Sequence, residues 1–490
     1  MTEKPVSRRN WIKYAGGAAV VVAAGAIGYA AYQSGQAPPP VTTTAAASTT
    51  AMTTGPPPQE TLQDWLKRVS APYKGTKLVM TSEATPPSRA ISSITDQEFT
   101  PLTGISVSWE LTPLEHVLEK VTMDAATCTG QYDLYYLDQA WVARFANDVI
   151  DMRDVWASKP DLTMPNYNID DFIPPLMQHV GMYKGKLVGP PCDCPIMLTA
   201  YRNDIFTKQG LSFPANLDAY METAKKLNNP PDMYGTTGQQ KGGHYSLYCD
   251  FDSILCLYGH GGAQSTNLGG CALGDAESVA GLDYMTELKK YMPPGVTTWD
   301  WSGEAESVAA GTVAMYTSWE EFFPMYDTEK SVIKGLMNFS IPPPATKLRD
   351  PAQCGFGETP NICHQGASVY TVARCSKNQE AAHIFLQWAT SSDIQTRGAI
   401  LGGGASAVRV STFTDPRATA SPLCRHFPFT LDAIEHHMST EPHNPSQPEV
   451  ADLVSHEVAN WYGGKYKTSE DALISMRDQI HKITGYVPPA

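Results

Sequence analysis

Several chemical signatures are missing from this 490-residue chain. It contains no Cys-x-x-Cys pair and no GxSxG, HExxH, P-loop or protein-kinase motif, so it lacks the common sequence marks of a zinc site, a hydrolase or a nucleotide-dependent enzyme. Basic residues are also few, because 36 Lys and Arg face 50 Asp and Glu and the formal net charge is −14. We therefore expect a non-enzymatic protein with no cofactor, no metal and no nucleic-acid partner. A neutral or cationic small solute is compatible with this charge.

The first 58 residues lack the composition of a folded core. Residues 33–58 contain almost no charged, aromatic or branched aliphatic side chains, which predicts a disordered Thr/Pro-rich stalk open to O-glycosylation. Before it, the twin-arginine pattern SRRNWIK at 7–13 precedes an apolar run at 14–31. We interpret residues 1–32 as a twin-arginine-like export signal, with a plain membrane anchor as the alternative. Both place the rest of the chain on the extracellular face of the membrane, anchored or secreted.

The chain has ten cysteines. An even number in an exported chain favours disulfide bonds. Zinc binding is the rival interpretation, but the pattern Cys192-x-Cys194 has poor ligand spacing. Pairings that the sequence permits are Cys249–Cys256 and Cys354–Cys363.

Strand and helix patterns alternate from Lys77 onward. Apolar and β-branched residues predict strands at Leu78–Thr81, Ile105–Glu110 and Tyr132–Leu137, and the apolar spacing within Pro113–Ala126 predicts a helix. This alternation is typical of a doubly wound α/β lobe, in which ligands lie beyond the carboxyl ends of the strands. Because 490 residues exceed one ordinary core, we expect two such domains.

Three stretches of the sequence resemble one family. The run KLVGPPCDCPIMLTAYRNDIFTKQGLSFPANLDAYMETAKKL at 186–227 places a proline-stiffened turn, a strand and two helices in one order. The others are FTPLTGISVSWELTPLEHVLEKVTMDAATCTGQYDLYYLDQAWVARF at 99–145 and SKNQEAAHIFLQWATSSDIQTRGAILGGGASAVRVSTFTDP at 376–416. Together they resemble the extracellular solute-binding proteins of family 1, the maltose-binding-protein-like receptors of carbohydrate ABC importers.

The resemblance implies a two-lobed periplasmic-binding-protein-like fold of class II, with two doubly wound α/β lobes joined by a multi-strand hinge. It implies a monomer that binds a small carbohydrate or polyol and delivers it to the membrane subunits of an ABC permease. Chain crossings between the lobes are expected near 190–195, 341–344 and 408–412. The implied lobes are 59–191 with 345–408, and 192–344 with 409–490.

Polar side chains follow the predicted strands of the first lobe. Glu83 comes after the strand at Leu78–Thr81, and Asp138 and Gln139 come after the strand that ends at Leu137. A carboxylate in a dry cleft accepts hydrogen bonds from two sugar hydroxyls, which predicts ligand binding here, and the resemblance implies the same role for Asp138 and Gln139. The alternatives are that Asp138 caps the next helix and that Glu83 lies in a solvated loop.

Aromatic and polar residues farther along the chain complete the predicted site. Trp319 ends the stretch GTVAMYTSW at 311–319, which resembles a family element whose Trp stacks on a sugar face; a buried Trp between the lobes is the alternative. The family's Gly-Gly-Trp is replaced near 366–370, so hydrogen bonding by His364 and Ser368 is expected there, although a lone His is often structural. The full set of predicted ligand-binding residues is Glu83, Asp138, Gln139, Asp193, Trp299, Trp319, His364 and Ser368.

Two other functions are compatible with the same residues. An exported carbohydrate-active hydrolase would use two carboxylates, such as Asp138 and Glu320, on either side of a scissile bond. A surface solute sensor would bind without any importer. The main hypothesis is a receptor that closes its hinge around a sugar or sugar alcohol, with no covalent chemistry.

Overall fold

The computed structural model describes residues 60–263, 271–348, 362–401 and 406–487. The predicted signal at 1–32, the predicted stalk at 33–58 and Cys354 lie outside the described residues. Within the described ranges, no helix combines the length and apolar character that a membrane crossing requires.

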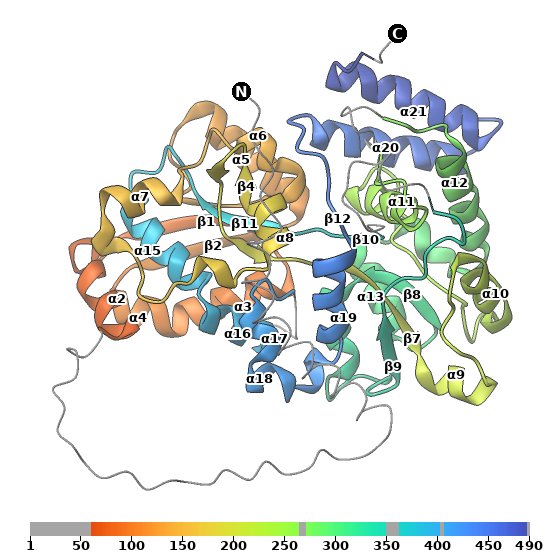
Figure 1. Cartoon of the computed structure of the whole chain (residues 1–490), viewed down its shortest axis with the longest axis horizontal. Helices are drawn as coiled ribbons and strands as arrows, with labels where there is room; N and C mark the ends of the chain where they lie inside the picture. The colour runs from red at the N-terminus through yellow and green to blue at the C-terminus, as the bar shows by residue number, and fades with distance from the viewer. Residues whose placement is uncertain (1–59, 264–270, 349–361, 402–405, 488–490) are drawn as a thin grey trace, which may run out of the picture. The chain divides into compact units, whose positions relative to one another are not determined.

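The first sheet combines the N-terminal strands with one strand from much later in the chain (Figure 1). Its order is β2-β1-β3-β11-β6; β1 pairs in parallel with β2 and β3, whereas β11 runs antiparallel to β3 and β6. The three strands predicted between residues 78 and 137 are confirmed. The strands are β1 (Lys77–Glu83), β2 (Ser106–Thr112), β3 (Leu134–Asp138), β6 (Pro191–Asp193) and β11 (Ser368–Val372).

Helices pack against this sheet through apolar faces. In α5 (Leu114–Thr127), Val117 and Val121 are fully buried, and the helix contacts β1 and β3. The late helix α15 (Gln379–Ala389) contacts β11, so the two segments of this lobe share one core. Other elements of this part are α2 (Leu62–Ser70), α3 (Pro86–Ile94), η2 (Thr95–Phe99), α4 (Thr100–Thr103), α6 (Val142–Phe145), α7 (Met152–Ser158), α8 (Pro174–Leu176), β4 (Met182–Tyr183), β5 (Lys186–Leu187) and α16 (Ser392–Leu401).

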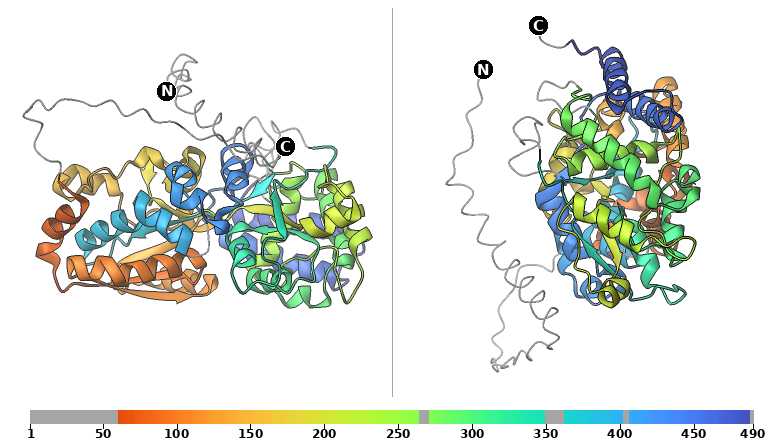
Figure 2. Two further views of the ribbon diagram at one scale, coloured as in Figure 1. Left: turned by 90° about the horizontal axis from the view of Figure 1, so that it is seen from below. Right: turned by 90° about the vertical axis from the view of Figure 1, so that its right-hand side faces the viewer.

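The second sheet has the order β8-β7-β9, and both of its strand pairs are antiparallel. Among the described residues it is thus a short antiparallel sheet, whereas the sequence indicated a second doubly wound one. The C-terminal helices lie beside α11 and α12 in both views of Figure 2. The elements are β7 (Met197–Arg202), α9 (Asn203–Gln209), α10 (Leu217–Leu227), α11 (Tyr245–Leu257), α12 (Ala276–Leu288), α13 (Trp301–Ala309), β8 (Met315–Trp319), η9 (Glu320–Asp327), β9 (Met337–Ser340), α20 (Gln447–Tyr462) and α21 (Ser469–Thr484).

The chain passes between the two sheets at short extended segments. The first passage is 194–196, between β6 and β7, within the expected crossing. The return comes at 363–368, later than expected, because Pro344 and Ala345 still hydrogen-bond to Leu217 and Leu257 of the second part. The two passages are joined by a hydrogen bond of 2.7 Å from the N–H of Gly366 to the carbonyl of Pro195. Short strands β10 (Cys363–His364) and β12 (Met438–Ser439) pair beside them.

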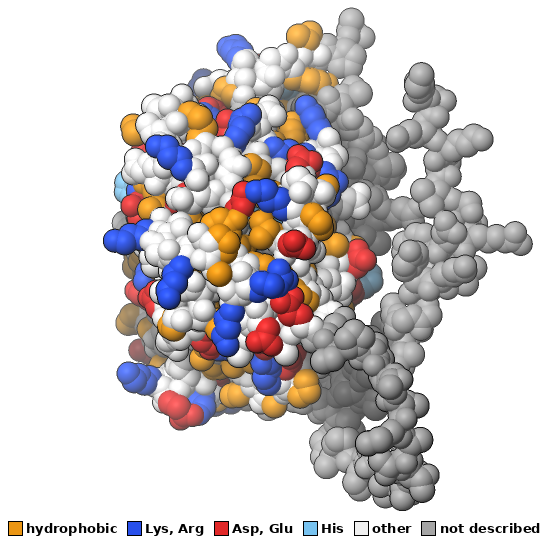
Figure 3. All heavy atoms as spheres, turned by 90° about the vertical axis from the view of Figure 1, so that its left-hand side faces the viewer, with side chains coloured by type: hydrophobic (Ala, Val, Ile, Leu, Met, Phe, Trp, Pro, Cys, Tyr) orange, Lys and Arg blue, Asp and Glu red, His pale blue; other side chains and the backbone are white. Residues whose placement is uncertain are grey.

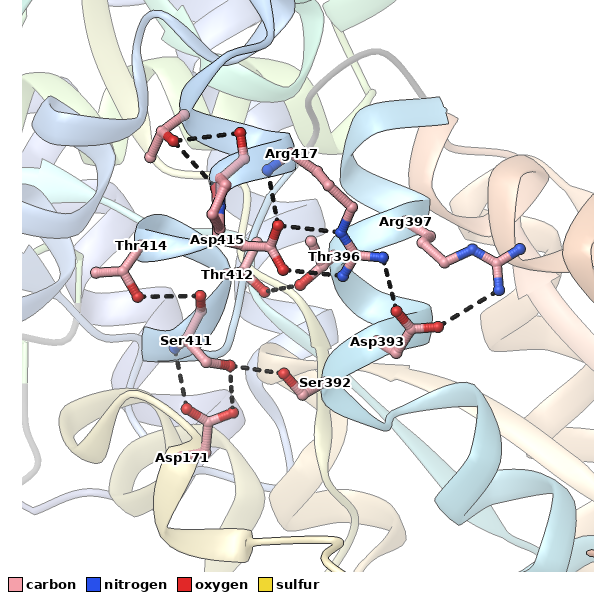
Figure 4. A network of polar contacts seen from close by, with 12 residues as sticks. Asp171, Ser392, Asp393, Thr396, Arg397, Ser411, Thr412, Thr414, Asp415 and Arg417 are labelled. Atoms are coloured by element: carbon pink, nitrogen blue, oxygen red, sulfur yellow. Dashed lines mark hydrogen bonds and ion pairs between the residues drawn. The ribbon is translucent and has the colours of Figure 1, made fainter. Parts of the chain in front are cut away.

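The third passage begins after two short helices that are tied to the first lobe by the polar network of Figure 4. Ser411 hydrogen-bonds to both carboxylate oxygens of Asp171, at 2.9 and 2.7 Å, and Arg417 pairs with Asp393 of α16 at 2.7 Å. Cys424 then lies in η10, which contacts η9 of the second part. The elements here are α17 (Val410–Thr414), α18 (Pro416–Thr419), η10 (Pro422–Cys424), α19 (Phe427–Asp432) and η11 (Ala433–His437).

One disulfide bond occurs among the described residues, and it joins Cys128 to Cys375. It links the end of α5 to the loop after β11, two segments that are 247 residues apart in sequence. The pairings considered from the sequence were wrong, because Cys249 and Cys363 carry buried free thiols. Sequence spacing could not reveal this bond, since the fold alone brings its two cysteines together.

Candidate ligand-binding site

Carboxylates of the first lobe gather where its strands end. Glu83 and Asp138 are the last residues of β1 and β3, and parallel strands end at the same edge of a sheet. The antiparallel strand β11 begins at that edge with Ser368, which lies opposite both Asp138 and Asp193. Sheet topology therefore brings together four of the residues predicted from sequence.

The second lobe contributes Trp319, the last residue of β8. Its indole Nε1 donates a hydrogen bond of 3.1 Å to Oε1 of Gln239, and its ring centre lies 5.6 Å from that of His364. A Cβ at Gly366 would lie 3.3 Å from the Trp319 ring, so the crossing segment packs directly on the indole. Glu320 and Glu321 follow Trp319 and are buried.

Gln139 fastens the crossing segment to the first lobe. Its side-chain amide donates to the carbonyl of Gln365 and accepts from the side-chain amide of Gln365. The backbone N–H of Gln139 donates to the carbonyl of Ala367 at 2.9 Å, and the N–H of Glu441 donates to Oε1 of Gln139 at 3.3 Å. These bonds place Gln139 at the junction, where it organises the segment that carries Ser368.

His364 lies between two buried carboxylates. Its Nδ1 is 3.2 Å from Asp252 and its Nε2 is 3.9 Å from Glu441. Burial lowers the pKa of His364, but the hydrogen bond and charge of Asp252 outweigh this and leave the pKa raised. Asp252, Cys256 and His364 are close enough together to hold one metal ion, although the sequence predicted none.

The carboxyl side chains at the strand ends are buried, which makes them weaker acids than in water. Burial raises the pKa of Glu83 well above its usual value, and the charges of Glu321 and Asp193 raise it further. Burial raises the pKa of Asp193 to about 7, although contacts with Tyr136 and Ser368 lower it. Burial also raises the pKa of Asp138, which caps η3 (Gln139–Trp141) by accepting from the N–H of Ala140 at 2.9 Å. The alternative interpretation from the sequence, that Asp138 caps the next helix, is thus correct for one of its two carboxylate oxygens.

Comparison of the sequence with known protein families identifies the family of this chain. The profile of the bacterial extracellular solute-binding proteins matches residues 95–422, about two thirds of the chain. The chain belongs to this family. It is 21% identical over 428 residues to a probable amino-acid ABC transporter periplasmic-binding protein of Sinorhizobium fredii, covering 86% of this chain and 92% of that protein. It is 24% identical over 361 residues to the mannitol-binding protein of Pseudomonas aeruginosa, covering 70% and 74%.

Solved structures of solute-binding proteins share the fold. An ABC transporter solute-binding protein from Agrobacterium radiobacter in complex with ribitol superposes with a TM-score of 0.74 at 25% identity, covering 84% of this chain and 99% of that one. Maltose-bound MalE3 of T. maritima superposes with a TM-score of 0.71 at 22% identity, covering 83% and 100%. The expected two-lobed fold is confirmed.

Seven of the eight predicted residues of this solute-binding protein lie in or beside the junction, and Trp299 does not. Trp299 lies after the short helix η8 (Pro294–Thr298), where added Cβ atoms at Gly295 and Gly303 would come within 2.7 and 3.0 Å of its side chain. Its side chain packs against the core cluster that includes residues of α10 and β8. It therefore serves to hold η8 against α13.

Several site residues were missed by the sequence analysis. Tyr136 donates to Glu83 at 3.3 Å, and Tyr245 donates to Glu441 at 2.7 Å. Asp252 lies in the apolar helix α11, where an acid among buried apolar residues is a signal that the sequence did offer. Glu441 has no such signal, because an irregular segment before α20 carries it to the junction.

Proposed function

We propose that this protein captures a sugar or sugar alcohol outside the membrane by hinge closure and delivers it to the permease of an ABC importer. The observation that carries this proposal is that buried carboxylates from strand ends of one lobe lie near Glu320 and Glu321, which directly follow Trp319 in the other lobe. Family membership supports solute binding. One relative is a mannitol-binding protein, and two similar solved structures contain ribitol or maltose. These similarities support a polyhydroxylated solute.

The proposed binding mode follows from the chemistry of the two lobes. Carboxylates such as Asp138 and Asp193 accept hydrogen bonds from hydroxyls, and each such bond in a dry site contributes about 1.5–3 kcal/mol. The indole of Trp319 offers an apolar face to the C–H groups of a sugar. Because these contacts come from both lobes, the solute binds the closed form better than the open form and shifts the population toward it.

We propose that binding leaves the solute chemically unchanged. The proteins of this family are binding proteins, and buried carboxylates serve hydroxyl recognition as well as catalysis. Incubation of the protein with a bound oligosaccharide, followed by chromatography, tests this point. Recovery of the intact sugar supports a receptor, whereas appearance of shorter products would favour the hydrolase alternative.

The proposed cellular arrangement is a lobe pair carried outside the membrane by the segments before residue 60. The proposed lobes differ from the expected limits of 59–191 with 345–408 and 192–344 with 409–490, because the second crossing lies at 363–368 and the third follows residue 419. The face shown in Figure 3 mixes Lys and Arg with Asp and Glu among scattered apolar side chains. Such a mixed surface suits a monomer that docks transiently on its permease.

A thermal-shift screen tests the proposed function directly. Ribitol, D-mannitol, D-tagatose, maltose and maltotriose cover the sizes of solute that the fold accommodates in related proteins. A ligand that binds only the folded protein raises its melting temperature in a concentration-dependent way. At least one member should do so; amino acids that stabilise the protein when no sugar or polyol does would contradict the proposal.

A further inference from the structure

The junction between the lobes holds a set of buried carboxylates with little balancing positive charge. We call Glu83, Asp138, Asp193, Glu320 and Glu321 the cleft carboxylates, and each is at most 8% exposed. Among the described residues, no Lys or Arg forms an ion pair with any of them. The one basic side chain paired with the set is His426, whose Nε2 lies 3.5 Å from Glu320. This interior contrasts with the mixed charges of the face in Figure 3.

Several polar atoms of the cleft carboxylates and of Ser368 have no hydrogen bond of standard geometry, although Tyr136 and Ser368 lie close enough to Asp193 to lower its pKa. Neither oxygen of Asp193 has a hydrogen bond of standard geometry, and the same holds for Oε2 of Glu321 and for Oγ of Ser368. All three residues are more than nine-tenths buried. Buried acceptors without donors are costly and rare in folded proteins, so these atoms indicate a ligand that brings several donors.

The unpaired atoms do not form a metal site. Among the described residues, the set close enough to hold one ion is Asp252, Cys256 and His364, and it includes none of the cleft carboxylates. The carboxylates are thus spread too widely to share one ion as ligands. An organic molecule with donors at several positions fits this spacing better.

Like charges also meet across the junction. Glu83 ends β1 of the first lobe, whereas Glu321 lies in η9, directly after β8 of the second. The charges of Glu321 and Asp193 act on Glu83 strongly enough to raise its pKa beyond the effect of burial. Closing the lobes therefore brings carboxylates together, and a positive charge between them would turn this repulsion into attraction.

From these contacts we infer that the solute is a hydroxylated amine, such as an amino sugar or an amino sugar alcohol, whose ammonium group binds between Glu83, Asp193 and Glu321. An ammonium group offers a charge and three N–H donors. Asp138 and Ser368 lie beside it for the hydroxyls, and Trp319 for the carbon chain. This inference rests on the proposed function and narrows its solute class.

Matched ligands separate the inference from the proposed function. D-sorbitol, 1-amino-1-deoxy-D-sorbitol and the N-acetyl form of that amine differ at one substituent, as do glucose, glucosamine and N-acetylglucosamine. In isothermal titration of the whole protein at pH 7.5, each amine should bind at least about tenfold more tightly than its two neutral counterparts. Neutral compounds that bind as tightly as the amines would overturn the inference and leave the proposed function standing. If no compound of either series binds, the inference is overturned, and the thermal-shift panel decides separately whether the proposed function stands.

A charge-removing variant tests the location of the ammonium group. Asp193→Asn keeps the side-chain shape and should weaken binding of the amine at least about tenfold more than binding of the neutral alcohol, so that most of the amine preference is lost. Asp232→Asn is the matched control, since Asp232 is exposed, and it should keep the full preference. Glu321→Gln serves as a second variant should Asp193→Asn fail to fold. An unchanged amine preference in a folded variant overturns the inference.

Amine binding should also strengthen as pH rises from 6 to 8. The pKa of Asp193 is about 7 in the absence of ligand, so its carboxylate becomes fully available to a cation only above that pH, while the alkylamine of 1-amino-1-deoxy-D-sorbitol, the ligand for this test, stays protonated. An affinity that falls over this range would contradict the inference. The groups that face Asp193 are Glu83, Tyr136, Asp138, Cys192, Cys194, Glu320, Glu321, Ser368 and Tyr370.

Discussion

Replacement of Asp138 offers a sharp test of the site, because this carboxylate performs two separable tasks. Oδ1 of Asp138 accepts a hydrogen bond of 2.9 Å from the N–H of Ala140 and so caps η3. The residue is 3% exposed at the end of β3, opposite Ser368. Asp138→Ala removes both the cap and the ligand-facing charge, whereas Asp138→Asn keeps an oxygen that can cap and removes only the charge.

The expected magnitudes differ for the two tasks. Loss of a charge-assisted hydrogen bond to the solute costs about 1.5–3 kcal/mol, which is about 10- to 150-fold in Kd. Loss of the cap lowers the free energy of unfolding by about 0.5–2 kcal/mol, and Asn retains most of that contribution. Asp138→Ala should therefore weaken both binding and stability, and Asp138→Asn should weaken binding with little loss of stability.

Isothermal titration and calorimetric unfolding measure the two effects separately. The titrant is the tightest-binding member of the panel found by thermal shift, and circular dichroism confirms that each variant is folded. Unchanged heats and affinity in both folded variants would refute the role of Asp138 in binding. A loss of stability without a loss of affinity would leave Asp138 with capping alone.

Three further predictions follow from other features of the fold. Asp193 has a pKa raised to about 7 in the folded protein against an ordinary value of about 4. Its protonated form therefore favours folding, and this contribution to stability is lost as pH rises from 4 to 7. The melting temperature of the ligand-free protein should fall over that range, and it should fall less in Asp193→Asn. Replacing Cys128 and Cys375 together by Ser should lower the free energy of unfolding by about 2–5 kcal/mol in denaturant titrations without changing ligand affinity, because the bond closes a long loop away from the junction; a large loss of affinity would contradict this. Gly366→Ala should weaken binding of the solute by about 1–3 kcal/mol, because the added Cβ would lie 3.3 Å from the ring of Trp319. Gly463→Ala is the control, because its Cβ would meet only backbone oxygens, at 3.5 Å. This variant should bind the solute normally in the same titration.

Strand ends were the part of the site that the sequence could predict. The alternation that marks β1 and β3 also fixes where they end, so the amino-acid pattern alone places Glu83 and Asp138 at one edge of the sheet. Trp319 followed from the strand before it in the same way. Local pattern suffices for these residues because each is the last residue of a regular strand.

Contacts made by irregular segments could not be predicted in this way. Glu441 reaches His364 from a loop before α20, and Gln365 meets Gln139 across 226 residues of sequence. Trp299 packs closely on Gly295 and Gly303, a contact that the sequence pattern did not indicate, and ligand binding by Trp299 stays a prediction. The disulfide between Cys128 and Cys375 likewise depends on tertiary structure alone.

The most direct test of the account is isothermal titration of the purified protein with the panel of sugars, sugar alcohols and their amines, followed by chromatography of the released ligand. The account predicts saturable binding of one molecule per chain to at least one member, with the ligand recovered unchanged. Absence of binding across the panel, or recovery of a converted product, would contradict it.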